Sequence, residues 1–426
     1  MTASIVELHV GSASGRLVAP PSKSYTHRAL MLAHQARRPY VIDHPLRADD
    51  TVATRNGIAK LGHLVRAGPD RWLVTPRLLR RGRRGLVIDC RGSGTTLRFL
   101  LAAAAALPSA TRFRGDESLA RRPLAGLEDS LRENGARIIH ADRRTLPLTI
   151  SGPIRAGAFH VDGTRSSQFS SSLLLTLPFL TGDSSLEIEG PLVSGIYLEA
   201  TAAILAHHGI RLRREGGSWK VPGDQSVRRR GFTIPGDWSS AAYWAVAAAV
   251  TGGKVRIDGV SRRWPQADSR ILDILSGAGV HVLQRSTWVE VEGRPATGFD
   301  VDLTSSPDLY PLLAAAACTI PEESRLRGAP QLVHKESDRI AETRRMLTAA
   351  GASFRMGRRG LLIRGQRRIR PFGRIQFFDH RMVMAAAVAS LAAGGPSRIG
   401  DFEAVRKSFP GFWSGLRHLG VEVRLR

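Results

Sequence analysis

The stretch PPSKSYTHRALMLA at residues 20–33 holds a pattern that recurs along the whole chain. Its prolines end any strand that precedes them, and its serines suit the N-cap of a helix. Lys23 and Arg28 then fall near the start of that helix, where backbone N–H groups and the helix dipole already favour an anion. The stretch therefore predicts a helix start that binds phosphate or carboxylate. Taken alone, it also fits an ordinary capped helix with two solvated cations.

Six segments share this design of a polar opening followed by residues rich in Ala and Leu, and they recur at intervals of about 70 residues. They occupy residues 22–36, 93–107, 166–180, 237–250, 306–319 and 379–393. A helix that is apolar on all sides must be buried, so each segment predicts a core helix with its polar opening at one end. Six unrelated alanine-rich helices are the alternative, but they leave the even spacing unexplained.

Strands and a second, more polar helix complete most repeats. Short strands such as SLEIEG (185–190) and KVRIDGV (254–260) follow the apolar helices. The second helices end near a glycine, which suits a helix C-terminus, and are expected at residues 51–62, 122–136, 269–279 and 339–352. A chain of 426 residues exceeds what one core usually organises. We therefore expect an α/β protein of two domains, each with three such units.

Composition limits the class of protein. The formal net charge of +25 raises the expectation of nucleic-acid binding, but the basic residues are scattered and show no zinc-ligand spacing or basic tail. Cys90 and Cys318 are too few for a disulfide framework or a metal site, and we expect both to be small buried residues. No signal-like segment or membrane-length apolar run is visible. These features predict a cytoplasmic protein that binds neither nucleic acid nor membrane.

The polar openings supply the residues that could carry chemistry. They include a glycine-hydroxyl turn, an arginine pair, serine and amide groups, a carboxylate and mixed-charge clusters, in the stretches 92–98, 121–123, 166–168, 194–197, 306–311, 335–339, 379–382 and 407–410. Each has an ordinary reading as a helix cap or a solvated surface group. However, the chain has only six lysines, and Lys23, Lys335 and Lys407 all lie in these stretches. Such clustering favours a site that holds anions.

Eight of these motifs, in this order, resemble the EPSP synthase family, the 3-phosphoshikimate 1-carboxyvinyltransferases. The matching motifs are PSKSYTHRAL, SGTTLR, RRPL, SSQF, the aspartate before the fifth apolar helix, KESDR, DHRM and KSFP. The resemblance covers essentially the whole chain. It implies transfer of the enolpyruvyl group of phosphoenolpyruvate to the 5-hydroxyl of shikimate 3-phosphate, by addition and elimination with release of phosphate. It implies no metal or organic cofactor, and a place in the shikimate pathway of chorismate and aromatic amino acid biosynthesis.

The resemblance also implies the enolpyruvyl transferase fold, in which each of two domains holds three βαβαββ-type units in pseudo-threefold arrangement. One domain is expected at residues 17–229. The other is expected to be discontinuous, at residues 1–16 and 230–426. The active site is expected in the cleft between them, and the protein is expected to be a monomer.

Carried over motif by motif, the resemblance implies three sets of site residues. Shikimate 3-phosphate would be bound by Lys23, Ser24, Arg28, Ser166, Ser167, Gln168, Ser194, Asp308 and Lys335, with Tyr197 near the ring. Phosphoenolpyruvate would be bound by Lys23, Gly94, Arg122, Gln168, Arg339, Arg381 and Lys407. The catalytic residues would be Asp308 as the base for the 5-hydroxyl, with Glu336 and Lys23 moving protons at the methylene carbon.

The chain departs from the family pattern in two places. Gly92 stands where many members have Asn, so a side-chain contact to substrate is either lost or supplied by water or Ser93. Gln331 stands near the usual position of an Asn, and His334 precedes Lys335. Because Gly94 leaves room beside the phosphoenolpyruvate site, glyphosate is expected to compete with phosphoenolpyruvate.

Two alternative functions differ in their sequence requirements. The sister enzyme UDP-N-acetylglucosamine enolpyruvyl transferase shares the fold, but it carries Lys-Asn where this chain has Lys23-Ser24, and often a cysteine in a mobile loop. Neither Cys90 nor Cys318 falls in such a place. A nucleic-acid-binding protein is the alternative from another class, and it rests on the net charge alone.

Overall fold

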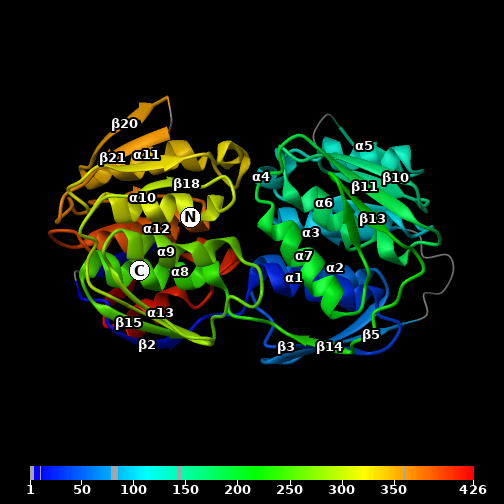
Figure 1. The fold of residues 1–426 in the computed structure, drawn as a ribbon, viewed down its shortest axis with the longest axis horizontal. Helices are drawn as coiled ribbons and strands as arrows, with labels where there is room; N and C mark the ends of the chain where they lie inside the picture. The colour runs from blue at the N-terminus through cyan, green and yellow to red at the C-terminus, as the bar shows by residue number, and fades with distance from the viewer. Residues whose placement is uncertain (1–3, 10, 78–84, 143–144, 359) are drawn as a thin grey trace. The chain divides into compact units, whose positions relative to one another are not determined.

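The computed structural model describes residues 4–9, 11–77, 85–142, 145–358 and 360–426. Contacts divide the chain into two compact units (Figure 1). Unit 1 comprises Met1–Pro20 and Pro235–Arg426, and unit 2 comprises Pro21–Ile234. The expected domain bounds at residues 16/17 and 229/230 differ from these by a few residues. The reason is strand pairing, because one strand extends to Val18 within unit 1 and another ends at Thr233 within unit 2.

Unit 2 contains, within its described residues, three four-stranded sheets. The first has the order β14-β3-β5-β4, with bounds Gly231–Thr233, Tyr40–Asp43, Arg71–Pro76 and His63–Ala67. The second is β6-β7-β9-β8, with bounds Leu86–Asp89, Thr111–Arg114, Leu148–Ser151 and Arg137–His140. The third is β10-β11-β13-β12, with bounds Ala158–Asp162, Ser184–Glu189, Ser218–Val221 and Arg213–Glu215. The helices are α1 (Lys23–Gln35), α2 (Asp49–Lys60), α3 (Gly94–Ala105), α4 (Glu117–Ala120), α5 (Ala125–Glu133), α6 (Ser167–Leu174), η1 (Leu177–Phe179) and α7 (Ile196–His207).

Unit 1 repeats this plan over the part of it that is described. Its first sheet is β16-β17-β15-β2, with bounds His281–Gln284, Trp288–Glu292, Lys254–Asp258 and Gly15–Val18. The second is β18-β19-β21-β20, with bounds Asp300–Asp302, Ser324–Arg327, Gly360–Arg364 and Ser353–Gly357. The third is β22-β23-β1-β24, with bounds Ile375–Gln376, Ser397–Gly400, Ile5–His9 and Glu422–Leu425. The helices are α8 (Trp238–Thr251), η2 (Ala267–Arg270), α9 (Ile271–Gly277), η3 (Pro307–Leu309), α10 (Tyr310–Ala317), η4 (Pro330–His334), α11 (Arg339–Ala350), α12 (His380–Ser390), η5 (Phe402–Lys407) and α13 (Phe412–His418).

Among the described residues, each of the six sheets contains one parallel strand pair, and antiparallel pairs complete the sheet. In four of the sheets the two parallel strands directly flank an apolar helix in the chain. In the parallel pair of β10 and β11, for example, the buried Phe159 lies opposite Leu186. This is the strand–helix–strand–helix–hairpin order that the sequence predicts, and the α/β class is confirmed. Two strands, β2 and β14, are exchanged between the sheets, so that neither pairs with the strand that follows its own helix in the chain. The strand before α1, β2, pairs with β15 of unit 1, whereas the strand before α8, β14, pairs with β3 of unit 2.

The six predicted apolar helices are α1, α3, α6, α8, α10 and α12, and they supply the core of each unit. In unit 1, α8, α10 and α12 pack against one another, with β2 and β15 on one side of them and β20 and β21 on the other (Figure 1). In unit 2, α3 packs against α1 and α6. Helix α6 ends earlier than predicted, at Leu174, and a short η1 turn with Pro178 near its start follows.

Two further sequence expectations meet the structure here. Cys90 and Cys318 are free and buried, as predicted. In the residues that the structure describes, none of the helices is long and apolar enough to span a membrane.

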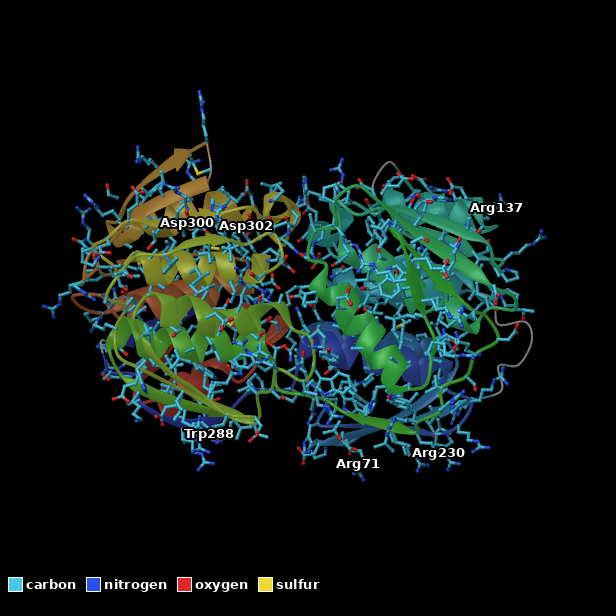
Figure 2. All side chains as sticks on the ribbon, viewed as in Figure 1. Arg71, Arg137, Arg230, Trp288, Asp300 and Asp302 are labelled. Atoms are coloured by element: carbon cyan, nitrogen blue, oxygen red, sulfur yellow. The ribbon has the colours of Figure 1, made fainter. Side chains whose placement is uncertain are left out.

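Exposed basic residues of unit 2 lie at its opposite ends, with Arg137 on β8 and with Arg71 and Arg230 near β5 and β14 (Figure 2). Arg71 is paired there with Asp43 at 2.7 Å.

Candidate functional site

The start of α1 carries the first candidate residues. Ser22 is the N-cap residue, but its hydroxyl makes no capping bond and instead lies 3.3 Å from Ser24 Oγ. Lys23 begins the helix, and its Nζ donates to Asp50 Oδ2 at 3.1 Å from the start of α2. An ammonium group at a helix start, beside the backbone N–H groups of the first turn, suits the binding of an anion.

Arg28 lies on the same helix one turn later and is buried. Its Nε donates to Thr201 Oγ1 at 2.8 Å, and its Nη2 donates to the Tyr197 carbonyl at 2.7 Å. Burial lowers the pKa of Arg28 to about 10, so the guanidinium stays charged at neutral pH. These bonds tie α1 to α7 and fix the cation beside the α7 start.

Ser194 lies in the loop between β11 and α7, whereas Tyr197 lies within α7. Tyr197 belongs to the first turn of α7, which begins at Ile196. Ser194 is buried and has a φ of 56°, the left-handed region that a serine rarely adopts. This turn into α7 places the Ser194 backbone and hydroxyl at a helix start, as at the other openings.

The α3 start brings two guanidinium groups together. A Cβ at Gly94 would lie 3.1 Å from Nη1 of Arg122 and 3.1 Å from Nη1 of Arg98, so only glycine fits without moving these side chains. Arg98 Nη1 donates to Gln168 Oε1 at 2.5 Å. Gln168 Nε2 in turn donates to Thr95 Oγ1 at 3.1 Å. The structure thus brings together Gly94, Arg122 and Gln168, which were predicted as site residues. It adds Arg98 and Thr95, which were not assigned a role.

The α6 start supplies hydroxyl groups. Ser166 is the N-cap residue, and its Oγ accepts from the Gln168 backbone N at 3.2 Å. Ser167 is buried in the first turn. Arg122 lies between α4 and α5, not within the start of α5 as the sequence suggests, because α5 begins only at Ala125.

The charged cluster of unit 1 is centred on the buried guanidinium of Arg339. Arg339 is 2% exposed and bonds three carboxylates: Nε donates to Asp379 at 2.7 Å, Nη1 to Asp308 at 2.8 Å and Nη2 to Glu336 at 2.8 Å. Burial favours its neutral form, but the three negative charges outweigh this and raise the pKa of Arg339. Asp379 is also the N-cap residue of α12 and accepts from the Arg381 backbone N at 2.9 Å. Burial raises its pKa, but the Arg339 charge prevails and the net pKa is lowered.

Asp308 lies in η3, just before α10 as predicted. Its Oδ1 accepts from Arg339, and its Oδ2 accepts from Arg381 Nη2 at 2.8 Å. The side chain is 18% exposed, so a ligand can still reach it. A carboxylate with one guanidinium on each oxygen is ionised, and it gains proton affinity when either arginine turns to another anion.

Two further predicted cations of unit 1 are Lys335 and Lys407. Lys335 follows η4, and Lys407 ends η5; both are partly buried. Glu336 is bonded to Arg339. Gln331, one of the departures from the family pattern, is buried and donates to the Thr304 carbonyl at 3.2 Å.

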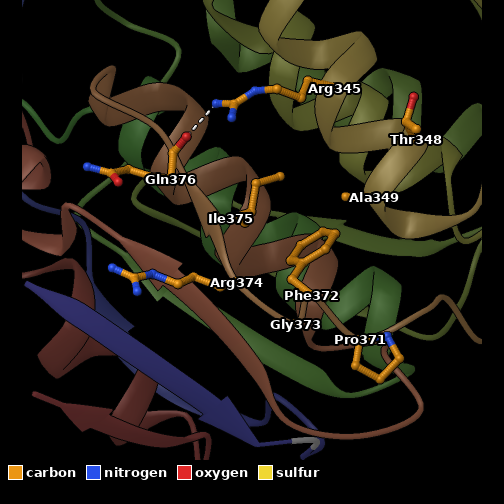
Figure 3. Close-up of a pocket in the computed structure, with 9 residues that line it drawn as sticks. All are labelled: Arg345, Thr348, Ala349, Pro371, Phe372, Gly373, Arg374, Ile375 and Gln376. Carbon is orange, nitrogen blue, oxygen red and sulfur yellow. Dashed lines mark hydrogen bonds between the residues drawn. The ribbon is translucent and has the colours of Figure 1, made fainter. Parts of the chain in front are cut away.

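Unit 1 also has a surface pocket of about 720 Å³ that contains none of these residues. The second half of α11 and residues 371–376 line it (Figure 3). Its Arg345 is already engaged, since it donates to the Gln376 carbonyl, pairs with Glu342 and lies 4.5 Å from the Phe377 ring centroid. The charged groups that suit the expected chemistry lie elsewhere, at the helix starts.

Known proteins place the chain in a family. The family model described as EPSP synthase (3-phosphoshikimate 1-carboxyvinyltransferase) matches residues 9–416. The chain is 40% identical over 415 residues to the 3-phosphoshikimate 1-carboxyvinyltransferase of Thermococcus kodakarensis, covering 96% of this chain and 98% of the relative. It is 39% identical over 426 residues to that of Aeropyrum pernix, covering 98% and 96%.

Solved structures share the fold. A structure of EPSP synthase from Acinetobacter baumannii has a TM-score of 0.82 at 23% identity, covering 99% of this chain and 100% of that one. The enolpyruvyl transferase NikO from Streptomyces tendae has a TM-score of 0.81 at 16% identity, covering 100% and 99%. The eight motifs, the six repeated units and these matches agree, and the chain therefore belongs to the EPSP synthase (3-phosphoshikimate 1-carboxyvinyltransferase) family, transferases of the shikimate pathway.

Proposed function

We propose that the chain carries out its family's reaction with the two sets of side chains described above, one on each unit. The reaction transfers the enolpyruvyl group of phosphoenolpyruvate to the 5-hydroxyl of shikimate 3-phosphate and releases phosphate. In this proposal both sets act on the same pair of substrates. The proposed steps involve protein side chains and the two substrates, and no metal or organic cofactor.

Each substrate is assigned a set of binding residues, and Lys23 and Gln168 belong to both sets. Shikimate 3-phosphate is bound by Lys23, Ser24, Arg28, Ser166, Ser167, Gln168, Ser194, Asp308 and Lys335. Phosphoenolpyruvate is bound by Lys23, Gly94, Arg122, Gln168, Arg339, Arg381 and Lys407. The proximity of the Arg98 and Arg122 guanidinium groups to the Gly94 backbone supports this assignment, because a phosphate or carboxylate offsets their mutual repulsion.

The observation that carries the proposal is the position of Asp308, with one oxygen on Arg339 and the other on Arg381. Phosphoenolpyruvate attracts both guanidinium groups, and the proton affinity of Asp308 then rises. Asp308 takes the proton of the 5-hydroxyl as that oxygen bonds to C2 of phosphoenolpyruvate. The methylene carbon receives a proton from the Lys23 ammonium group, or from Glu336 when that carboxyl group is protonated, which gives a tetrahedral adduct. Phosphate then leaves and the same group takes back one methyl proton, which restores the vinyl group.

Phosphate release from shikimate 3-phosphate and phosphoenolpyruvate tests the reaction. We expect Asp308→Ala to lower kcat by about 100- to 10,000-fold, the usual contribution of a general base. Calorimetric binding of shikimate 3-phosphate should remain measurable. Asp300→Ala, at an exposed carboxylate on β18 (Figure 2), is the matched control and should keep its activity.

Two results would overturn the proposal. Wild-type turnover by Asp308→Ala would remove the base assignment. A folded wild-type protein that releases no phosphate from shikimate 3-phosphate, but turns over UDP-N-acetylglucosamine, would assign the reaction to the sister enzyme instead.

We further propose that the protein works as a cytoplasmic monomer on small molecules, and binds neither nucleic acid nor membrane. The buried thiols of Cys90 and Cys318 and the wide spread of the basic residues support this. Gel filtration with light scattering tests the monomer. Tight nucleic-acid binding with a steep salt dependence would contradict the proposal.

A further inference from the structure

A second carboxyl group lies close to the charged cluster of unit 1. Asp268, in η2, is 2% exposed, and its Oδ2 accepts a short hydrogen bond from Ser239 Oγ in the first turn of α8. Its Oδ1 is buried and has no hydrogen-bond partner among the described residues. A buried carboxyl oxygen without a donor is costly when the group is ionised, so its charge state depends on its neighbours.

Helix α8 packs against η2, which carries Asp268, and also against η3 and α12, which carry Asp308 and Arg381. Ser239 and Tyr243 are four residues apart and share one helix face. The buried Tyr243 hydroxyl lies among the charges of Arg381, Arg339 and Asp308, and burial raises its pKa to about 12. The Ser239 side of the same face therefore points toward the same charges.

The charges that act on Asp268 agree with this packing. Burial and then the negative charge of Asp308 raise the pKa of Asp268 to about 7. The positive charge of Arg381 and the Ser239 hydrogen bond oppose this rise, and the Asp237 charge adds to it. The groups that act on Asp268 thus come from η3, α12 and both sides of the α8 start.

We propose that Asp268 is a positioning residue for the transfer reaction, whose charge sets how strongly Asp308 takes up a proton and how strongly Arg381 attracts an anion. The proposal rests on the assignment of Asp308 as the base. When Asp268 is ionised, Asp308 is a stronger base and Arg381 is partly neutralised. When Asp268 is protonated, Arg381 attracts phosphoenolpyruvate fully.

The two states suit successive steps. Binding of phosphoenolpyruvate at Arg381 withdraws a positive charge from Asp268 and favours its protonated form. Once Asp308 has taken the hydroxyl proton, its negative charge is gone and the pKa of Asp268 falls. By reciprocity, ionisation of Asp268 must weaken phosphoenolpyruvate binding. An asparagine would serve equally well if residue 268 only accepted the Ser239 hydrogen bond.

Steady-state kinetics of Asp268→Asn between pH 6 and pH 8 test the proposal. Near pH 6 the carboxyl is mostly protonated, so the KM for phosphoenolpyruvate should agree with wild type within about twofold. At pH 8 wild type carries the extra negative charge, and its KM should be on the order of tenfold higher than that of the variant, as for a pKa coupling of about one unit. The kcat of the variant should be lower at pH 8, because Asp308 is then a weaker base.

The substrates also titrate in this pH range, but they do so equally for both proteins. The ratio of the wild-type KM to the variant KM at each pH therefore cancels that effect. Asp273→Asn, at an exposed carboxylate on α9, is the matched control and should give a ratio that does not change with pH. A constant ratio for Asp268→Asn would overturn the proposal and leave Asp268 a structural acceptor.

A second variant keeps the test decisive if Asp268→Asn fails to fold. Ser239→Ala removes the hydrogen bond that lowers the pKa of Asp268, so the change in KM should move to higher pH. An unchanged pH dependence would overturn the proposal. Failure of the base assignment is distinguishable, because only that failure leaves Asp308→Ala active.

Discussion

Replacing Arg339 by methionine should produce a large loss of stability that depends on pH. The side chain is 2% exposed and bonds Asp308, Glu336 and Asp379, of which Asp379 is fully buried. Removing one partner of a buried ion pair leaves an uncompensated charge and costs about 3–5 kcal/mol. Methionine retains most of the side-chain volume, so this loss is electrostatic rather than a cavity effect.

The dependence on pH follows from Asp379. In wild type its folded-state pKa is lowered from 3.8, so it contributes stability above that pH, and this contribution is lost as pH falls through the folded-state pKa. In Arg339→Met the buried carboxyl has lost its main countercharge, and its folded-state pKa lies above the unfolded value. The variant is therefore penalised increasingly as pH rises above about 4. The difference in stability between wild type and the variant should therefore grow from pH 4 to pH 7.

Urea unfolding followed by tryptophan fluorescence and circular dichroism at pH 4, 5.5 and 7 measures this difference. Arg345→Met is the matched control on the same helix, because Arg345 is 48% exposed and its pair with Glu342 is worth at most about 1 kcal/mol. A loss for Arg339→Met no larger than the control, or one that does not grow with pH, would refute the reasoning.

Two further predictions concern Gly94 and the pair of His34 and His63. Gly94→Ala should raise the KM for phosphoenolpyruvate several-fold with little change in melting temperature, because the new methyl group must displace the Arg98 and Arg122 side chains by only a few tenths of an ångström; an unchanged KM would contradict it. His34 and His63 are bonded at 2.9 Å, and burial lowers their pKa values to about 3 and about 4. Their neutral forms are favoured in the fold, so stability is full above pH 6.5 and falls as pH drops toward 4. Urea midpoints at pH 7 and pH 5 should show this fall, and His63→Gln should reduce it; an equal fall in the variant would assign it to other groups.

The apolar helices could be predicted from the sequence because burial of a whole helix leaves a composition signal that needs no partner. The same holds for Ser93 and Ser166, which cap α3 and α6 through bonds to residues two or three positions away. Helix α7, by contrast, is not among the helices expected from the sequence, because Gly195 directly before it gives a turn signal that hides the helix start.

Side-chain partners far apart in the chain could not be predicted. Arg28 bonds Thr201, 173 residues away, and Arg98 bonds Gln168, 70 residues away. Nothing local marks Asp268, whose neighbours come from three separate segments. Arg98 closes the SGTTLR motif, and its position one turn into the same helix as Gly94 was the available signal.

The exchange of β2 and β14 has a consequence for the order in which the chain can be synthesised and cut. Unit 2 is one continuous segment, whereas β2 must await β15, which follows unit 2, and β1 must await β23 and β24 near the end of the chain. The two ends of the chain meet in unit 1, where Ile5 and Arg426 exchange backbone hydrogen bonds at 2.9 and 2.8 Å. Joining these ends and opening the chain between Pro20 and Pro21 would give a circular permutant in which each unit is a single uninterrupted segment.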